Sequence, residues 1–229
     1  MSFDSPLPPY NASDPTATFL NSSCLDLLMI ELVPMAYRIV NEVDAAIDDR
    51  IPSSAEKKDS GGSVGKGSVA TNGGTAGGTS NGGAGKGGKM DEEEERDAVF
   101  FRLEMLGYRV GQGLVERFSR DRPRFTDTLD VIKFLCKDLW MLVFRKQIDN
   151  LKTNHRGVYV LTDNSFRPFA RMSTEAGGQA VVRAQPFLWF PCGIIRGALA
   201  SMGINATVQA ETSELPGATF QIKSVTVKP

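Results

Sequence analysis

The chain has 229 residues, 41% of them hydrophobic, and 26 Lys and Arg residues nearly balance 27 Asp and Glu residues. This length and composition predict one globular domain with a proper hydrophobic core. The basic residues are scattered along the chain, so we expect no binding of a nucleic-acid backbone. No segment offers about eighteen uncharged apolar residues, and the amino terminus lacks a secretory-signal pattern, so we expect a cytosolic protein.

One tract differs sharply in composition from the rest of the chain. Residues 51–90 are dominated by Gly, Ser, Thr and Ala and offer almost nothing to bury. Such a tract cannot offset its own ordering entropy, so it predicts a disordered insertion. We therefore expect a disordered tail over 1–18 and a single α/β domain over 19–229, interrupted by the insertion.

Two predicted helices flank the insertion. Before it, Ser23 and Asp26 form a capping signal, and Pro34 is expected to kink the helix that follows. After it, an acidic run opens the second helix, because acids suit a helix amino terminus. Apolar residues recur at helical spacing in both helices, at Leu25, Leu28, Leu32, Met35, Ile39 and Val43, and at Val99, Leu103, Leu106, Val110, Leu114 and Phe118.

Glycines interrupt the second helix and a later one. Gly107 and Gly111 lie four residues apart on one face, where missing side chains let another backbone come close. Gly193 and Gly197 have the same spacing. Packing inside the chain and packing against a partner are equally compatible with this pattern.

The stretch "KFLCKDLWMLVFRKQIDNLKTNHRGVYVL", residues 133–161, holds a cysteine and the only histidine of the chain. Cys136 falls in the middle of a broad apolar arc of a third predicted helix, a setting that raises the pKa of a thiol and makes it inert. His155 follows nineteen positions later in a polar turn, so we expect no Cys-His catalysis. The pattern predicts that this stretch belongs to the hydrophobic core and is not an active site. We expect Cys136, Trp140, Cys192 and Gly197 to be structural core residues.

The three cysteines, Cys24, Cys136 and Cys192, are widely separated and each is set among apolar residues. This suits reduced, buried thiols and not a disulfide framework or a zinc site. We expect no catalytic residue, no metal, no cofactor and no lipidation site.

Beyond the third helix come the strand "VYVLT", the short segment "QAVVRA" as a second strand, the helix "PFLWFPCGIIRGALASMG", and two strands around a Pro216-Gly217 turn. Gly203 is a reasonable stop for the last helix. The order is α-α-α-β-β-α-β-β. It predicts an α+β fold with a small antiparallel sheet of about four strands packed against about four helices.

Several of these segments resemble a known family. "LGYRVGQGLVERF", "LDVIKFLCKDLWMLVFRKQIDNLKTNHRGVYVLTDNSF" and "CGIIRGALASMGI" look like the subunit-6 type of the TRAPP (transport protein particle) complex. The likeness runs from about residue 100 to residue 225, and the order and spacing of the pieces make it specific. The resemblance implies the compact mixed fold of the small TRAPP subunits.

The resemblance also implies a role. Small TRAPP subunits are not enzymes themselves, and they bind a related, acylated core subunit through their first two helices. Their complex tethers vesicles and promotes nucleotide exchange on a Rab GTPase between endoplasmic reticulum and Golgi, which implies only peripheral membrane contact, through the complex. The implied interface residues are Leu28, Leu32, Met35, Leu103, Leu106, Gly107, Val110 and Gly111.

One departure from the family concerns the acyl chain. In the related core subunit an acylated cysteine precedes the third helix, and the corresponding place here falls near Arg122, where no thiol is present. The large residues Phe134, Trp140 and Phe144 are candidates to fill the space themselves. A ligand-binding module with an open hydrophobic pocket in the same fold is the alternative function, and a thiol enzyme using Cys136 is the third.

Overall fold

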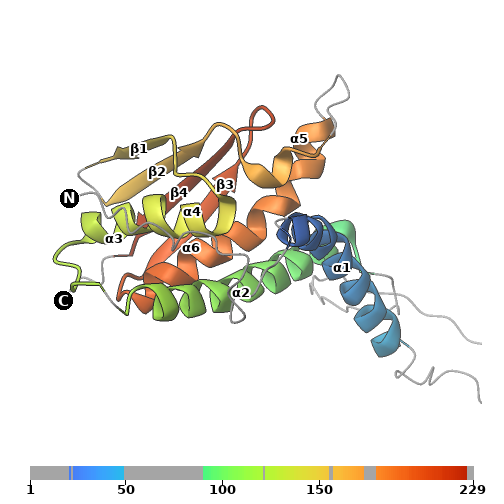
Figure 1. The fold of residues 1–229 in the computed structure, drawn as a ribbon. Coiled ribbons are helices and arrows are strands. Elements are labelled where there is room, and N and C mark those ends of the chain that lie inside the picture. The colour runs from blue at the N-terminus through green and yellow to red at the C-terminus, as the bar shows by residue number, and fades with distance from the viewer. Residues whose placement is uncertain are drawn as a thin grey trace, which may run out of the picture.

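The computed structural model describes residues 21, 23–48, 90–120, 122–154, 157–172 and 179–225. The predicted tail over 1–18, the predicted insertion up to residue 89, and His155 lie outside these residues. The chain folds as an α+β domain with a four-stranded antiparallel sheet (Figure 1). The predicted fold class is therefore confirmed.

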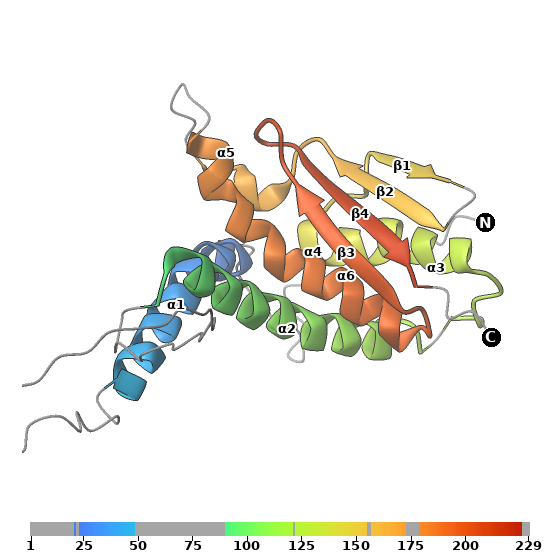
Figure 2. The same cartoon turned by 180° about the vertical axis from the view of Figure 1, so that it is seen from behind.

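Helix α1, Ser23–Asp48, begins one step earlier than its sequence suggests. The side chain of Asn21 accepts a hydrogen bond from the Ser23 backbone N–H at 2.9 Å, so Asn21 and not Ser23 caps the helix. Asp26, the other half of the expected capping signal, pairs instead with an arginine far along the chain. Pro34 lies inside α1, and both views show the first part of this helix running in a different direction from the rest (Figures 1 and 2).

Helix α2, Glu92–Phe118, starts where the acidic run predicts. The side chain of Asp91 accepts a hydrogen bond from the Glu94 backbone N–H at 2.8 Å, and four glutamates occupy the first turn. A capping carboxylate and first-turn acids both stabilise a helix amino terminus.

The third predicted helix is continuous but not uniform. It comprises α3, Thr128–Phe134, a π-helical segment, Leu135–Leu139, and α4, Trp140–Phe144. Asp127 caps its start, and Arg145 ends it in the left-handed conformation with φ 62°. The wider π turn lies between two α segments, as such bulges commonly do.

The sheet has the strand order β1-β2-β4-β3, and every neighbouring pair is antiparallel. Its strands are β1, Asn150–Thr153, β2, Val158–Asp163, β3, Ala206–Glu211, and β4, Ala218–Ser224. Leu161 of β2 pairs with Phe220 of β4, and both side chains are fully buried. The inner face of the sheet is thus built on its two central strands.

One strand assignment was wrong. The segment "QAVVRA", counted as the second strand, forms helix α5, Gln179–Ala184, and the second strand is β1. Two short 3-10 helices, Arg167–Phe169 and Gln185–Leu188, flank α5, and α6, Trp189–Ser201, follows at once. Gly203, with φ +83°, ends α6 as expected, because glycine tolerates the left-handed region.

The elements stack in layers. In both views α3, α4 and α6 lie against one face of the sheet, and α2 packs against α6 on the side away from the sheet (Figures 1 and 2). The main core lies between sheet and helices and centres on Trp140, Phe144, Phe166 and Phe220. A second hydrophobic cluster joins α1 to α2 and Trp189.

Candidate partner interface

The amino-terminal half of α1 is apolar on nearly every side. Met29 and Leu32 are buried against the domain, while Leu27 is 65% exposed and Leu28 58% exposed. A helix that is hydrophobic all round is normally buried on all sides. The exposed side of α1 therefore carries an apolar surface that the other described residues leave uncovered, next to the exposed Glu31 that pairs with Arg38.

The junction of α1 and α2 brings several of the expected interface residues together. Leu32 and Leu103 are buried in the second cluster, and Met35 and Leu106 are half-buried against it. Val110 is 38% exposed on α2. Leu28, Met35, Leu106 and Val110 thus remain accessible to another chain, whereas Leu32 and Leu103 chiefly hold the two helices together.

The helix glycines face inward and form a seam between α2 and α6. A Cβ at Gly107 would overlap the Phe190 carbonyl oxygen, and one at Gly111 would overlap that of Ile194. Gly193 and Gly197 of α6 lie just as close to the backbone of α2. The expected interface must therefore be corrected at Gly107 and Gly111, because α6 of the same chain already covers them.

Polar contacts fix the same two helices. The guanidinium of Arg196 on α6 forms two hydrogen bonds with the Glu104 carboxylate on α2, one of them between Nη2 and Oε2 at 2.6 Å. The Arg196 guanidinium also stacks over the Tyr108 ring, 4.5 Å from its centroid. Glu104 is a buried residue, 8% exposed, and these hydrogen bonds replace the water that its carboxylate loses. They also fix the relative position of α2 and α6 along the seam.

The cysteines differ from one another. Cys136 and Cys192 are buried, and burial raises the pKa of each thiol to about 12. A thiolate is therefore scarce at neutral pH, which disfavours nucleophilic chemistry. Cys24 is exposed on α1, which corrects the expectation that all three thiols are buried. Within the described residues no three His, Cys, Asp or Glu side chains gather in a way that could hold a metal ion.

The core residue Trp140 takes part in a buried polar network. Its indole N–H donates to the Asp163 carboxylate at 2.8 Å, and the Lys146 ammonium donates to the same carboxylate at 2.7 Å. Asp163 is fully buried, so these donors replace its lost hydration. Burial alone would lower the pKa of Lys146, but its hydrogen bonds to Asp149 and Asp163 outweigh burial and raise it.

Arg122 lies near the place that the resemblance assigns to the acylated cysteine of the related core subunit. Its guanidinium makes two hydrogen bonds with the Asp138 carboxylate, at 2.7 and 3.0 Å, and lies 4.7 Å from the centroid of the Phe134 ring. Phe134, Trp140 and Phe144 are all buried in the main core. Large side chains and an ion pair therefore occupy this part of the domain.

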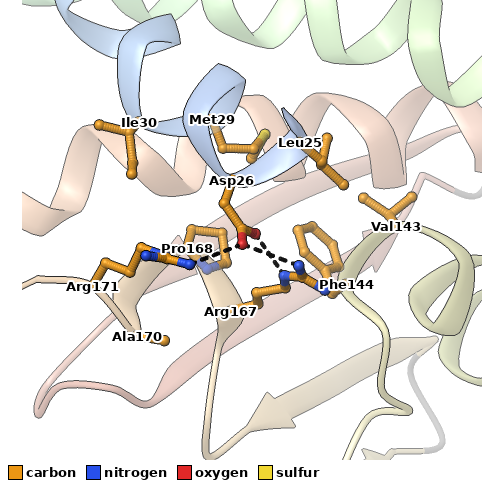
Figure 3. Close-up of a pocket in the computed structure, with 10 residues that line it drawn as sticks. All are labelled: Leu25, Asp26, Met29, Ile30, Val143, Phe144, Arg167, Pro168, Ala170 and Arg171. Atoms are coloured by element: carbon orange, nitrogen blue, oxygen red, sulfur yellow. Dashed lines mark hydrogen bonds and ion pairs between the residues drawn. The ribbon is translucent and has the colours of Figure 1, made fainter. Parts of the chain in front are cut away.

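An apolar cavity lies between α1, α4 and the 3-10 helix after β2 (Figure 3). This partly open cavity has a volume of about 180 Å³. Asp26 of α1 lies between two guanidiniums, with hydrogen bonds of 2.7 and 3.1 Å to Arg167 and a longer ion pair of 3.7 Å to Arg171. The cavity is lined by Leu25, Asp26, Met29, Ile30, Val143, Phe144, Arg167, Pro168, Ala170 and Arg171.

Sequence reasoning missed this cavity because its walls come from distant segments. Asp26 and Arg167 are 141 positions apart, and nothing local in either segment predicts the pair. The hydrogen bonds from Arg167 hold the pKa of Asp26 below its usual value, so the carboxylate stays ionised at neutral pH.

Comparisons with known proteins identify relatives of this chain. Residues 25–225 match the family described as transport protein particle (TRAPP) component. The chain is 53% identical to trafficking protein particle complex subunit 6b of Danio rerio over 130 residues, which cover 57% of this chain and 82% of that protein. It is 52% identical to subunit 6B of Homo sapiens over 130 residues, 57% of this chain and 81% of that protein.

The chain is also similar to trafficking protein particle complex subunit 6A of Homo sapiens, with 51% identity over 120 residues that cover 52% of this chain and 74% of that protein. Among solved structures it is similar to subunit 3 from Naegleria fowleri covalently bound to palmitic acid, with a TM-score of 0.48 and 15% identity over 57% of this chain and 82% of that one. Over the residues with described structure, no helix is both long enough and apolar enough to span a membrane.

Proposed function

Because the chain belongs to the family of transport protein particle (TRAPP) components, we propose that it is a non-catalytic structural subunit of the TRAPP complex that binds a related core subunit through α1 and α2. In this proposal the complex tethers vesicles and promotes nucleotide exchange on a Rab GTPase in transport from the endoplasmic reticulum to the Golgi and at the Golgi. The chain itself is cytoplasmic and meets Golgi and endoplasmic reticulum membranes only peripherally, through the complex. The partner we favour is the acylated core subunit.

The exposed apolar side of α1 is the observation that carries the proposal. Leu27 and Leu28 together expose large apolar surface at a helix whose opposite side is already packed against α2. A monomer gains nothing from exposing such a surface, whereas a permanent partner would remove it from water. Leu106 and Val110 extend the accessible apolar positions onto α2.

The non-catalytic part of the proposal has separate support. The two buried thiols have a pKa of about 12, and the relatives bear the names of trafficking complex subunits. The nucleotide exchange reaction is therefore assigned to the assembled complex and not to a residue of this chain.

The test is affinity purification of the full chain with mass spectrometry of its partners, comparing wild type with Leu28→Glu. A charge in an apolar interface should weaken binding of TRAPP subunits by at least about tenfold. Leu129→Glu is the matched control, because Leu129 is 38% exposed on α3, away from α1. Both variants should keep the wild-type circular dichroism spectrum. Equal recovery of TRAPP subunits by wild type and Leu28→Glu would refute the assignment of the interface to α1.

A further inference from the structure

The start of α1 has no single hydrophobic face. From Ser23 to Ile30 the sequence is "SCLDLLMI", and Asp26 is the only charged residue in it. The hydrophobic effect depends on buried area and has no direction, so apolar side chains alone do not decide which side of this segment turns toward the domain. Another interaction must select the rotation of the helix start about its own axis.

Asp26 makes an interaction that does have a direction. Its carboxylate accepts hydrogen bonds of 2.7 and 3.1 Å from the Arg167 guanidinium, and its side chain is only 17% exposed (Figure 3). The same carboxylate lies 3.7 Å from the Arg171 guanidinium, and Arg167 has at least one further interaction. Because Arg167 belongs to the 3-10 helix Arg167–Phe169, Asp26 must face that helix for these hydrogen bonds to form.

The exposure of the neighbouring side chains follows from this orientation. Met29, three positions after Asp26, returns to the same side of the helix and is buried in the main core. Cys24 and Leu28 are each two positions from Asp26, a turn of about 200°, and both are exposed. Another rotation would bury one apolar side chain in place of another, but it would carry Asp26 away from Arg167.

The packing of α1 changes close to this segment. Leu25 and Met29 pack with the main core, whereas Leu32 packs with the second cluster against α2. Pro34 has no N–H to donate to the Ile30 carbonyl, so the hydrogen-bond ladder of α1 has a gap between the two parts. The part of α1 that packs on α2 therefore constrains the rotation of the start less tightly than an unbroken helix would.

A polar group within an apolar surface can select one register among apolar alternatives. We infer that Asp26, held by Arg167, selects which apolar side of α1 faces the partner subunit, and so presents Leu27 and Leu28 to it. Asp26 is a positioning residue in this role, because its side chain is directed into its own domain (Figure 3). The inference rests on the proposed function, since the partner is the subunit that covers this side of α1.

The first experiment measures the rotation by alkylation of a cysteine on the inward side of α1. The reporter is Met29→Cys in a Cys24→Ser background of the full chain, treated with iodoacetamide and analysed by peptide mass spectrometry. Leu25→Cys is a second reporter on the same side, in case Met29→Cys lowers the stability of the domain. Each reporter is compared with and without Asp26→Leu, which removes the carboxylate and keeps a side chain of similar size.

Two controls accompany the reporters. Cys136 and Cys192 are buried elsewhere in the domain, so their alkylation in the same sample reports unfolding. Glu31→Leu is the matched variant, because it also removes an acid from α1, but one that is exposed and pairs with Arg38 of the same helix. It should leave the alkylation rate of the reporter unchanged.

The second experiment measures affinity for the TRAPP subunit that is recovered with the wild-type chain, by biolayer interferometry and without the reporter substitutions. Asp26→Leu should raise the alkylation rate of the inward cysteine by at least about tenfold, while Cys136 and Cys192 stay protected. If the competent rotation falls to about a tenth of the population, the affinity falls about tenfold. Asp26→Glu keeps the charge and should retain most of the wild-type affinity.

Three results would overturn the inference while the proposed function stands. An unchanged alkylation rate in Asp26→Leu would show that apolar packing alone fixes the rotation. Parallel labelling of Cys136 and Cys192 would show that Asp26 supports the whole domain and not the rotation of one helix. Faster alkylation with wild-type affinity would show that the partner does not recognise this side of α1. If no TRAPP subunit is recovered with the wild-type chain, the proposed function fails and presentation to a partner fails with it, whereas the alkylation rates still decide whether Asp26 fixes the rotation.

Discussion

Replacing Gly111 by alanine tests the seam between α2 and α6. The added Cβ would overlap the Ile194 carbonyl oxygen and lie 2.9 Å from the Ala198 nitrogen. Both atoms belong to the backbone of α6, so no side-chain rotation can remove the clash, and the helices must move apart. Overpacking a core costs about 1–3 kcal/mol, and a backbone clash belongs at the upper end.

Alanine also has a higher helix propensity than glycine, by about 1 kcal/mol, which offsets part of this cost. The expected net loss for Gly111→Ala is therefore about 2 kcal/mol in the free energy of unfolding. In a domain of this size that corresponds to a decrease of roughly 4–8 °C in the melting temperature.

The matched control is two residues away on the same helix. A Cβ at Gly113 would meet no atom within 4 Å, so Gly113→Ala should keep only the propensity gain and stabilise the protein by about 0.5–1 kcal/mol. Urea titration followed by circular dichroism measures both variants. A Gly111→Ala protein as stable as Gly113→Ala would show that the helices can separate at no cost, and the account of the seam would be wrong.

Asp163→Ala should destabilise the domain by about 3 kcal/mol, because it removes the acceptor of the buried Trp140 indole N–H and one of the two carboxylates that Lys146 binds. Asp163→Asn should lose less, and chemical denaturation checks both variants. The depressed pKa of Asp26 contributes stability that is complete above the ordinary value of 3.8 and is lost as the pH falls through the lower folded value. The difference in melting temperature between wild type and Arg167→Gln should therefore shrink below about pH 4, and a constant difference down to pH 2 would contradict this. With native protein, iodoacetamide should label Cys24 alone, and the two buried thiols should react only after unfolding; fast native labelling of three cysteines would contradict their burial.

Local signals account for what the sequence predicted well. The acids at the start of α2 and glycine at the end of α6 act within one turn of the helix they bound, so their effect can be recognised without the rest of the fold. The turn at Pro216 and Gly217 likewise joins neighbouring strands β3 and β4. These signals were enough for the α+β fold class.

The features that the sequence analysis did not predict depend on contacts between residues distant in sequence. The segment "QAVVRA" contains adjacent valines, which favour a strand, but it continues directly into a 3-10 helix and α6, and this context makes it helical. The spacing of Gly107 and Gly111 showed that a backbone comes close, yet not that it belongs to α6 of the same chain. The Asp26 and Arg167 pair, 141 positions apart, had no local signal at all.

The contact between the α2 and α6 backbones makes the outer side of α2 rigid. Side-chain rotamers do not determine the spacing of these helices at the glycines, since main-chain atoms meet main-chain atoms. Because α6 also packs against β3, the outer side of α2 is held at a fixed position relative to the sheet. A protein that binds there meets a rigid template and not a surface that must first be ordered, so most of its contact energy is kept as affinity.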